Sequence, residues 1–255
     1  RPMAGNNYYR LPILDGVELL DAKDHMASFP FHTHNTFNIT LVLSQLFTTK
    51  LNDRTLHAPP GTIMITNPGE VHSTICDKVS GNTFFTFYIP PPVLARLNQG
   101  SEVFFDNKVI DDPGLFHTLY TVSRAFEEPG VEQQLLAAVG ELVNRHGRTE
   151  VFTASTTQLF REFLAEDLSK KFSLETTAGK FGLDKYKFLR LFKQQTGLTP
   201  NNFIILKRVE KSKELLQSTG NLLDVAIEAG FYDATHFCKH FKRITGITPL
   251  AYKNA

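Results

Sequence analysis

The pattern F-x-x-x-F-K-x-x-T-G-[LI]-T-P occurs twice near the end of this 255-residue chain, and it constrains the fold more than any other feature. The first copy runs from Phe188 to Pro200 and the second from Phe237 to Pro249, at a constant offset of 49 (237 − 188 and 249 − 200). An internal repeat of this kind indicates two structural units of one type. The alternative is a pair of helical hairpins that merely pack together.

Each copy has the pattern of a helix that follows a tight turn. In the second copy, Phe237, Phe241 and Ile244 recur at i, i+4 and i+7, which is one face of a helix. Asp233 stands where an N-cap is favoured, and Gly246 stands where a left-handed residue ends a helix. A short helix, a tight turn and a second helix form the helix-turn-helix unit, which places its second helix in the DNA major groove.

The paired units resemble the C-terminal DNA-binding domain of the AraC/XylS family of bacterial transcription regulators. The run from Ala226 to Pro249 carries the most specific part of this resemblance, which covers residues 157–255. It implies two helix-turn-helix units that enter successive major grooves on one face of the DNA. The long helix that joins them is expected to start at Pro200 and to turn Arg208 outward.

The charge of the chain is unevenly distributed. Residues 157–255 hold 16 Lys and Arg against 10 Asp and Glu, whereas residues 1–156 hold 11 against 16. A basic C-terminal part beside an acidic N-terminal part favours phosphate binding by the former alone. Solvated helix faces could give the same totals, so the charge supports the motif argument without proving it.

The residues that helix packing leaves free are the candidates for DNA contact. The predicted set is Lys185, Tyr186, Lys187, Leu189, Arg190 and Lys193 in the first unit, and Ala234, Thr235, His236, Lys239, Lys242 and Arg243 in the second. By motif position, the resemblance implies that Arg190 faces base edges, where it could pair with guanine. Lys193 and Lys242 are expected at phosphates, although an exposed lysine can equally be a solvated charge. Because Ala234 offers little to a base, the first unit is expected to supply more of the sequence discrimination.

Residues 8–90 have the pattern of short strands. Apolar or alternating runs at Phe37–Phe47, Ile63–Thr66 and Thr83–Ile89 are separated by turn-forming residues, which is typical of a sandwich or barrel. Two segments, 30–34 and 60–72, resemble the motifs of cupin barrels. The predicted fold class is α+β with two domains: a cupin-like barrel or jelly roll with a helical hairpin in residues 1–147, a linker in 148–156, and an all-α DNA-binding domain in 157–255.

Three histidines stand where metal-binding cupins place their ligands, namely His32, His34 and His72. Imidazole suits zinc, iron, copper or nickel, but the glutamate that completes those sites is replaced here by the carboxylate-free segment 35–38. Three histidines and water could still hold a metal. The resemblance favours the other alternative, in which these histidines hydrogen-bond in or near an effector pocket without a metal or cofactor.

A small-molecule effector is expected inside the barrel, where alternate side chains of a strand point inward. Phe84, Thr86 and Tyr88 share one face of their strand, and Ser44 is an inward candidate on an earlier strand. With the three histidines they form the predicted effector site, although they could equally be core residues. The hydroxyl groups favour a sugar, whereas the 22 phenylalanines and the absence of tryptophan favour an apolar or aromatic effector as much.

Residues 112–147 are predicted to form two helices. Leu115, Leu119 and Val122 form one apolar stripe, Leu135 and Val139 belong to a second, and a Pro-Gly break separates them. Such a pair could cap the barrel. In the resembled family it often forms the dimer interface, so a homodimer is expected.

The remaining features limit the class of protein. No apolar run reaches the length of a membrane helix, and Cys76 and Cys238 form neither a disulfide framework nor a zinc motif, which favours the cytoplasm. No catalytic triad, phosphate loop or paired carboxylates indicate an enzyme.

The predicted function is that of a DNA-binding transcription regulator controlled by an effector. Activation through RNA polymerase is the commoner mode in the family, and repression is the alternative. A rival hypothesis is a metal-dependent cupin enzyme that uses His32, His34 and His72 and carries a regulatory DNA-binding tail. A third hypothesis is an interaction module whose helix-turn-helix units bind protein.

Overall fold

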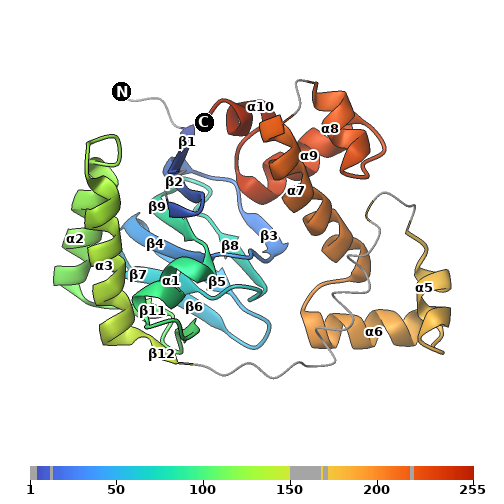
Figure 1. Ribbon diagram of the computed structural model, residues 1–255. Helices are drawn as coiled ribbons and strands as arrows, with labels where there is room; N and C mark the ends of the chain where they lie inside the picture. Colours follow the sequence, from blue (N-terminus) through green and yellow to red (C-terminus); the bar gives the residue numbers. More distant parts are fainter. Residues whose placement is uncertain (1–4, 12–13, 150–167, 169–171, 219–220) are drawn as a thin grey trace. The chain divides into compact units, whose positions relative to one another are not determined.

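The computed structural model describes residues 5–11, 14–149, 168, 172–218 and 221–255 (Figure 1). The chain divides into two compact units, Arg1–Ser28 with Thr33–Phe152 and Phe29–His32 with Thr153–Ala255. Strands predominate before residue 112, and all the described elements after residue 172 are helices. The predicted α+β chain, with a sheet-rich N-terminal part and a helical C-terminal part, is confirmed. Within the described ranges, no helix combines the length and the apolar character that crossing a membrane requires.

Two sheets make up the β structure. The larger has the order β1-β2-β9-β4-β7-β11, with β1 Gly5–Leu11, β2 Val17–His25, β9 Asn82–Ile89, β4 Phe37–Ser44, β7 Ile63–Thr66 and β11 Val109–Ile110. The smaller has the order β3-β8-β5-β6, with β3 Phe29–His32, β8 His72–Ile75, β5 Phe47–Lys50 and β6 Thr55–Ala58. The single strand predicted for Phe37–Phe47 is instead divided between β4 and β5, because Gln45 has a φ of 60° and turns the chain.

The two faces of the larger sheet have different partners. On β9, Phe85 and Phe87 belong to the apolar core that includes the helices, while Phe84 points to the opposite face. There its ring meets Phe47 of the smaller sheet with 5.0 Å between the ring centroids. The even-numbered residues of β9 therefore face the space between the sheets, and the odd-numbered residues face the helices.

Three helices follow the strands, namely α1 Pro91–Leu97, α2 Pro113–Arg124 and α3 Val131–His146. The predicted break between α2 and α3 is present at Gly130, whose φ is 82°. The helix α2 begins at its cap Asp112, which accepts a hydrogen bond from the Leu115 amide at 3.0 Å. Arg148 and Thr149, the first residues of the predicted linker, form β12, which pairs with β10 (Val103–Phe104). The rest of that linker lies outside the described residues.

The C-terminal unit contains α5 Leu174–Lys180, α6 Lys185–Thr196, α7 Pro200–Ser218, α8 Leu222–Glu228, α9 Ala234–Thr245 and α10 Pro249–Lys253. The predicted support, recognition and connecting helices are all present, and α10 is an element that the sequence pattern did not predict. Most of residues 157–171, the first part of the predicted DNA-binding domain, lies outside the described residues. The phenylalanines of the repeat, Phe188 and Phe192 on α6 and Phe237 and Phe241 on α9, are fully buried. They form the core that fixes the outer faces of both helices.

Candidate functional site

The recognition helices α6 and α9 begin at aspartate caps. One Asp184 oxygen accepts hydrogen bonds from the amides of Tyr186 and Lys187 at 2.9 Å each. Asp233 accepts one from the His236 amide at 2.6 Å. The hydrogen bonds from the backbone lower the pKa of Asp184, so its carboxylate stays charged at the positive end of the helix dipole. The caps fix the start of each helix and therefore which residues its first turn presents to solvent.

The repeated spacing T-G-[LI]-T-P has a physical explanation at the end of each recognition helix. The hydroxyl of buried Thr196 donates to the Phe192 carbonyl at 2.7 Å and accepts from the Leu198 amide at 3.2 Å. Gly197 then ends α6 in the left-handed conformation, with a φ of 76°. Thr199 accepts a hydrogen bond from the Asn202 amide at 3.2 Å as α7 begins. The two threonines and the glycine of the motif therefore end one helix and start the next.

The turn inside the second unit requires glycine for packing. Gly230 has a φ of +95°, and a Cβ atom there would lie 2.0 Å from the carbonyl oxygen of Leu168. The same carbonyl accepts a hydrogen bond from Arg208 Nε at 2.9 Å. Arg208 was predicted to face outward, which is wrong, because its guanidinium is half-buried against this turn and burial lowers its pKa. In the first unit Gly182 also has a positive φ, of +66°, but a Cβ there would meet nothing within 4 Å.

The first recognition helix presents a basic and aromatic surface. The side chains of Tyr186, Lys187, Arg190 and Lys193 are exposed, Tyr186 by 73%, while Lys185 and Leu189 are half-buried. The ammonium group of Lys185 lies 5.4 Å from the centroid of the Tyr186 ring. All six predicted contact residues of this unit can therefore be reached from solvent on α6.

The second recognition helix is divided between exposed and packed residues. Thr235, Lys239, Lys242 and Arg243 are exposed, whereas Ala234 and His236 are half-buried. The His236 ring lies 4.5 Å from that of His240 and 5.7 Å from that of Phe231. His236 is thus held within an aromatic cluster, and it has less freedom to reach DNA than the exposed residues.

The structure adds Tyr232 to the candidates that sequence reasoning gave. This residue lies in the turn before α9 and is 91% exposed. The sequence signal for this residue is a large aromatic side chain directly before an N-cap. Such a ring is usually packed in a turn, so its exposure marks a surface that can contact a partner. Its position next to the first turn of α9 places it beside the predicted contact residues.

Three of the predicted effector residues, Phe84, Thr86 and Tyr88, lie on the inner side of the larger sheet, on β9. The hydroxyls of Thr86 on β9 and Thr40 on β4 are 2.9 Å apart and buried. Phe84 is packed between the sheets. Ser44 accepts a hydrogen bond from the Thr83 amide at 3.1 Å, where the register of β4 and β9 shifts. The Ser44 hydroxyl therefore satisfies a backbone amide at the shift in register. The alternation of residues in the sequence does not predict this role.

A polar cluster surrounds Tyr88 at the other end of β9. The His34 ring lies 5.2 Å from the Tyr88 ring and 5.5 Å from the His72 ring. Burial is the main cause that raises the pKa of Tyr88, so its hydroxyl stays protonated and can donate. His34, His72 and Tyr88 are therefore brought together, as the effector hypothesis requires, while Thr86 and Phe84 lie further along the strand.

The three predicted metal ligands are divided between the two compact units. His34 and His72 belong to the first unit, and His32 belongs to the second. His32 Nδ1 is 2.6 Å from the Pro30 carbonyl and His72 Nδ1 is 2.9 Å from the Glu70 carbonyl. A carbonyl can only accept, so each Nδ1 carries the proton and each Nε2 has a lone pair, as in histidines that bind metals. Each ring can therefore offer a lone pair to a metal such as zinc or to a polar effector, and the three-histidine metal site stays a prediction.

Comparison with known proteins decides the family. A model described as an AraC-like ligand-binding domain matches residues 16–140, and a model described as a helix-turn-helix domain matches residues 177–255. The chain belongs to the AraC family of transcription regulators. The expected family membership is confirmed, and the matched ranges fall on the sheet-rich part and on the repeat.

Relatives of this AraC-family chain include an HTH-type transcriptional regulator of Bacillus subtilis (strain 168) named YbfI, 26% identical over 237 residues, or 86% of this chain and 85% of that one. The transcriptional activator RhaR of Escherichia coli (strain K12) is 26% identical over 249 residues, or 89% of this chain and 87% of that one. These relatives are transcription regulators, and they give no support to the hypothesis of a cupin enzyme.

Solved structures show the same two-part fold. An apo form of a ToxT point variant from Vibrio cholerae matches with a TM-score of 0.59 and 10% identity, over 94% of this chain and 96% of that one. Wild-type ToxT with a bound unsaturated fatty acid matches with a TM-score of 0.56 and 10% identity, over 98% and 97%. At this identity the match concerns the fold alone.

Proposed function

We propose that this AraC-family regulator reads DNA with the outer faces of α6 and α9. The observation that carries the proposal is the identical construction of the two helices, which share the aspartate cap, the buried phenylalanine pair and the left-handed glycine. A repeat that preserves two helices in this detail presents two outer faces of the same geometry, whose side chains can differ. The connecting helix α7 has 19 residues. It is about 28 Å long, comparable with the roughly 34 Å between successive major grooves.

Arg190 and Lys239 have the leading roles in this proposal. Both are exposed, and they occupy equivalent positions of the repeat, at the same offset of 49 (239 − 190). Arg190 can pair with the edge of a guanine. Lys193 and Lys242, with Arg243, meet phosphates and position the helices. Tyr186, Tyr232 and Thr235 are exposed beside these residues and extend the contact surface. His236 is half-buried and packs beneath it.

The N-terminal domain is proposed to bind a small-molecule effector, and Tyr88 with His34 and His72 forms the polar end of the proposed inner site. The protein acts as a homodimer through α2 and α3, and as an activator that engages RNA polymerase. It has no catalytic role and works in the cytoplasm, where bacterial DNA lies. The activator role is supported by the relative RhaR, which is named as a transcriptional activator.

A binding experiment tests the DNA-reading proposal. Duplexes selected with the wild-type protein are titrated by fluorescence anisotropy against wild type, Arg190→Ala and Lys239→Ala, with circular dichroism as the control for folding. Both variants should keep their helical signal and lose specific binding by about 1–3 kcal/mol. Unchanged affinity in both variants would show that these helices do not read the DNA.

A second measurement separates the regulator from a metal enzyme. Elemental analysis of the purified chain should find no transition metal at one equivalent. Metal at that level, with binding lost in His34→Ala, would instead support a metal centre at the three histidines.

A further inference from the structure

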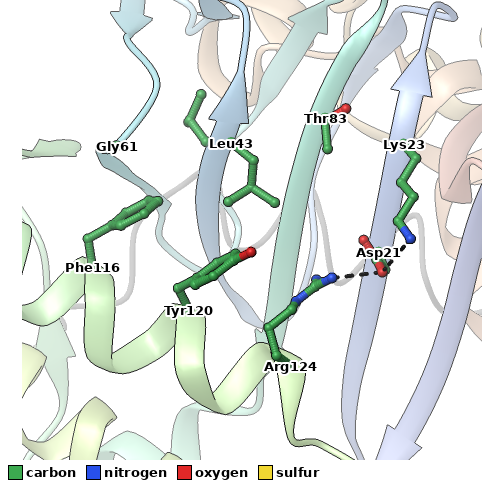
Figure 2. A pocket seen from close by; sticks show the side chains of 9 residues that line it. Asp21, Lys23, Leu43, Gly61, Thr83, Phe116, Tyr120 and Arg124 are labelled. Atoms are coloured by element: carbon green, nitrogen blue, oxygen red, sulfur yellow. Dashed lines mark ion pairs between the residues drawn. The ribbon is translucent and has the colours of Figure 1, made fainter.

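A cavity lies on the helix-facing side of the larger sheet, outside the space between the sheets. It has a volume of about 420 Å³ and opens between helix α2 and the ends of strands β2, β4 and β9 (Figure 2). Asp21, Lys23, Leu43, Thr83, Tyr120 and Arg124 are among the residues that line it. Its size lies within the usual range of small-molecule pockets. None of its lining residues belongs to the predicted effector set.

A buried carboxylate is the unusual feature of this cavity. Asp21 is only 5% exposed, and it shares the helix-facing side of β2 with the apolar core residues Val17 and Leu19. One of its oxygens is 3.6 Å from Arg124 and 4.0 Å from Lys23, too far for good hydrogen bonds. The other oxygen has no hydrogen-bond partner among the residues that the structure describes. A buried acceptor in this state costs free energy, so a ligand that donates a hydrogen bond to it is favoured.

The opposite wall of the cavity is aromatic and belongs to α2. The rings of Phe116 and Tyr120 are nearly parallel, with an interplanar angle of 4° and centroids 6.4 Å apart. Tyr120 is 37% exposed, and Figure 2 shows its hydroxyl directed into the space between the helix and the sheet. The Arg124 guanidinium lies 5.5 Å from the centroid of the Tyr120 ring. The cavity thus combines an aromatic surface with a carboxylate and a guanidinium.

The charges around the cavity balance. Asp21 faces the two cations Arg124 and Lys23, which line the cavity with it. The exposed carboxylate of Asp24 does not line the cavity, but it lies 3.4 Å from the hydroxyl of the lining residue Thr83. Counted with Asp24, two carboxylates stand against two cations, so the surroundings of the cavity do not select an ionic ligand. Adjacent hydroxyl groups match this arrangement, because each can donate to a carboxylate and accept from a cation. The C–H groups of a sugar ring can also pack on the negative face of an aromatic ring.

We propose that this cavity binds a neutral monosaccharide, with Asp21 and Arg124 hydrogen-bonded to its hydroxyls and its ring packed on Tyr120. The site is separate from the inner effector site and does not depend on the DNA-reading surface. Because Phe116, Tyr120 and Arg124 all belong to α2, the bound sugar fixes this helix against the sheet. Its occupancy would therefore act on the helix pair α2 and α3, which is the proposed dimer interface.

Calorimetry and thermal unfolding of the full chain test the proposal. The probes are the neutral sugars D-glucose, D-galactose and D-xylose, with D-glucuronate, D-glucosamine and benzoate as the charged and aromatic comparisons. The variants are Asp21→Asn and Tyr120→Ala, with Thr118→Val, at an exposed position of the same helix α2, as the matched control. Tyr120 is partly exposed, so its variant should fold even where the buried substitution does not.

At least one neutral sugar should bind saturably and raise the melting temperature of the wild-type protein. The dissociation constant should increase about tenfold or more in Asp21→Asn and Tyr120→Ala and remain unchanged in Thr118→Val. No binding of any neutral sugar, a preference for one of the charged or aromatic probes, or an equal loss of binding in Thr118→Val would overturn the proposal. DNA affinity is measured separately, so a failure of the sugar site is distinguishable from a failure of the proposed regulator function.

Discussion

Thr196 and Thr245, at equivalent positions of the two repeats, make the same hydrogen bonds at the ends of the two recognition helices. Each hydroxyl donates to the carbonyl four residues earlier, at 2.7 Å in the first unit and 2.8 Å in the second. Each also accepts from the amide two residues later, at 3.2 Å and 3.4 Å. Both threonines are buried. The repeat in the sequence is therefore a repeat of hydrogen bonds that end a helix.

Thr245→Val should destabilise the C-terminal unit by about 1–3 kcal/mol, because it removes the hydroxyl and leaves buried backbone groups without their partner. Thr235→Val, on the exposed face of the same helix, is the matched control and should change stability by less than about 0.5 kcal/mol. Urea unfolding measures both. Equal stabilities of the two variants would contradict the structural role of Thr245.

Gly230→Ala and Gly182→Ala should differ in their cost although both positions have a positive φ. At Gly182 only the conformational cost of about 1–2 kcal/mol applies. At Gly230 the new Cβ would also meet the Leu168 carbonyl at 2.0 Å, so the loss of unfolding free energy should be clearly larger. Denaturant midpoints of the two variants check this order, and the reverse order would show that the turn is not packed as described.

The N-terminal domain should lose stability in acid through Asp112. Its backbone hydrogen bond from Leu115, with help from Arg145 and His146, lowers the pKa of this carboxyl to about 2. The folded pKa lies below the unfolded value of about 3.9, so the contribution is fully present above that value and is lost as the pH falls toward about 2. Asp112→Asn keeps a side chain that can cap the helix but does not titrate. Its unfolding free energy should therefore fall less between pH 5 and pH 3 than that of the wild type, and parallel curves would contradict the assignment.

Lys193→Ala should weaken binding to all DNA sequences alike. The exposed ammonium group is proposed to meet a phosphate, so its loss should reduce the slope of log affinity against log salt by about one. Lys180→Ala, on the support helix of the same unit, serves as the control for a general change of charge. A change of sequence preference without a change of slope would contradict the phosphate role.

Local features of this fold could be predicted from the sequence. The caps Asp233 and Gly246 are correctly predicted, because capping depends on a few neighbouring residues. The strand alternation that separates Phe84 from Phe85 is local in the same sense. The ends of these helices and the faces of this strand are set by residues that are close in the sequence.

Features that depend on distant contacts could not be predicted. Arg208 looks like a solvated charge on a helix, and only the folded chain brings it to the Leu168 carbonyl. His236 likewise looks exposed until Phe231 and His240 enclose it. Asp21 appears in the sequence as a polar residue of an alternating strand, and its approach to Arg124 needs α2 folded over the sheet.

In vitro selection of random duplexes tests the central claim most directly, because it does not require a known operator. The wild-type protein should enrich two short sequence blocks about one turn of DNA, or 10–10.5 base pairs, apart for each chain. Arg190→Ala should relax one block and leave the other intact, and Lys239→Ala should do the reverse more weakly. A selection without enrichment, or an unchanged consensus in both variants, would contradict the claim that α6 and α9 read adjacent major grooves.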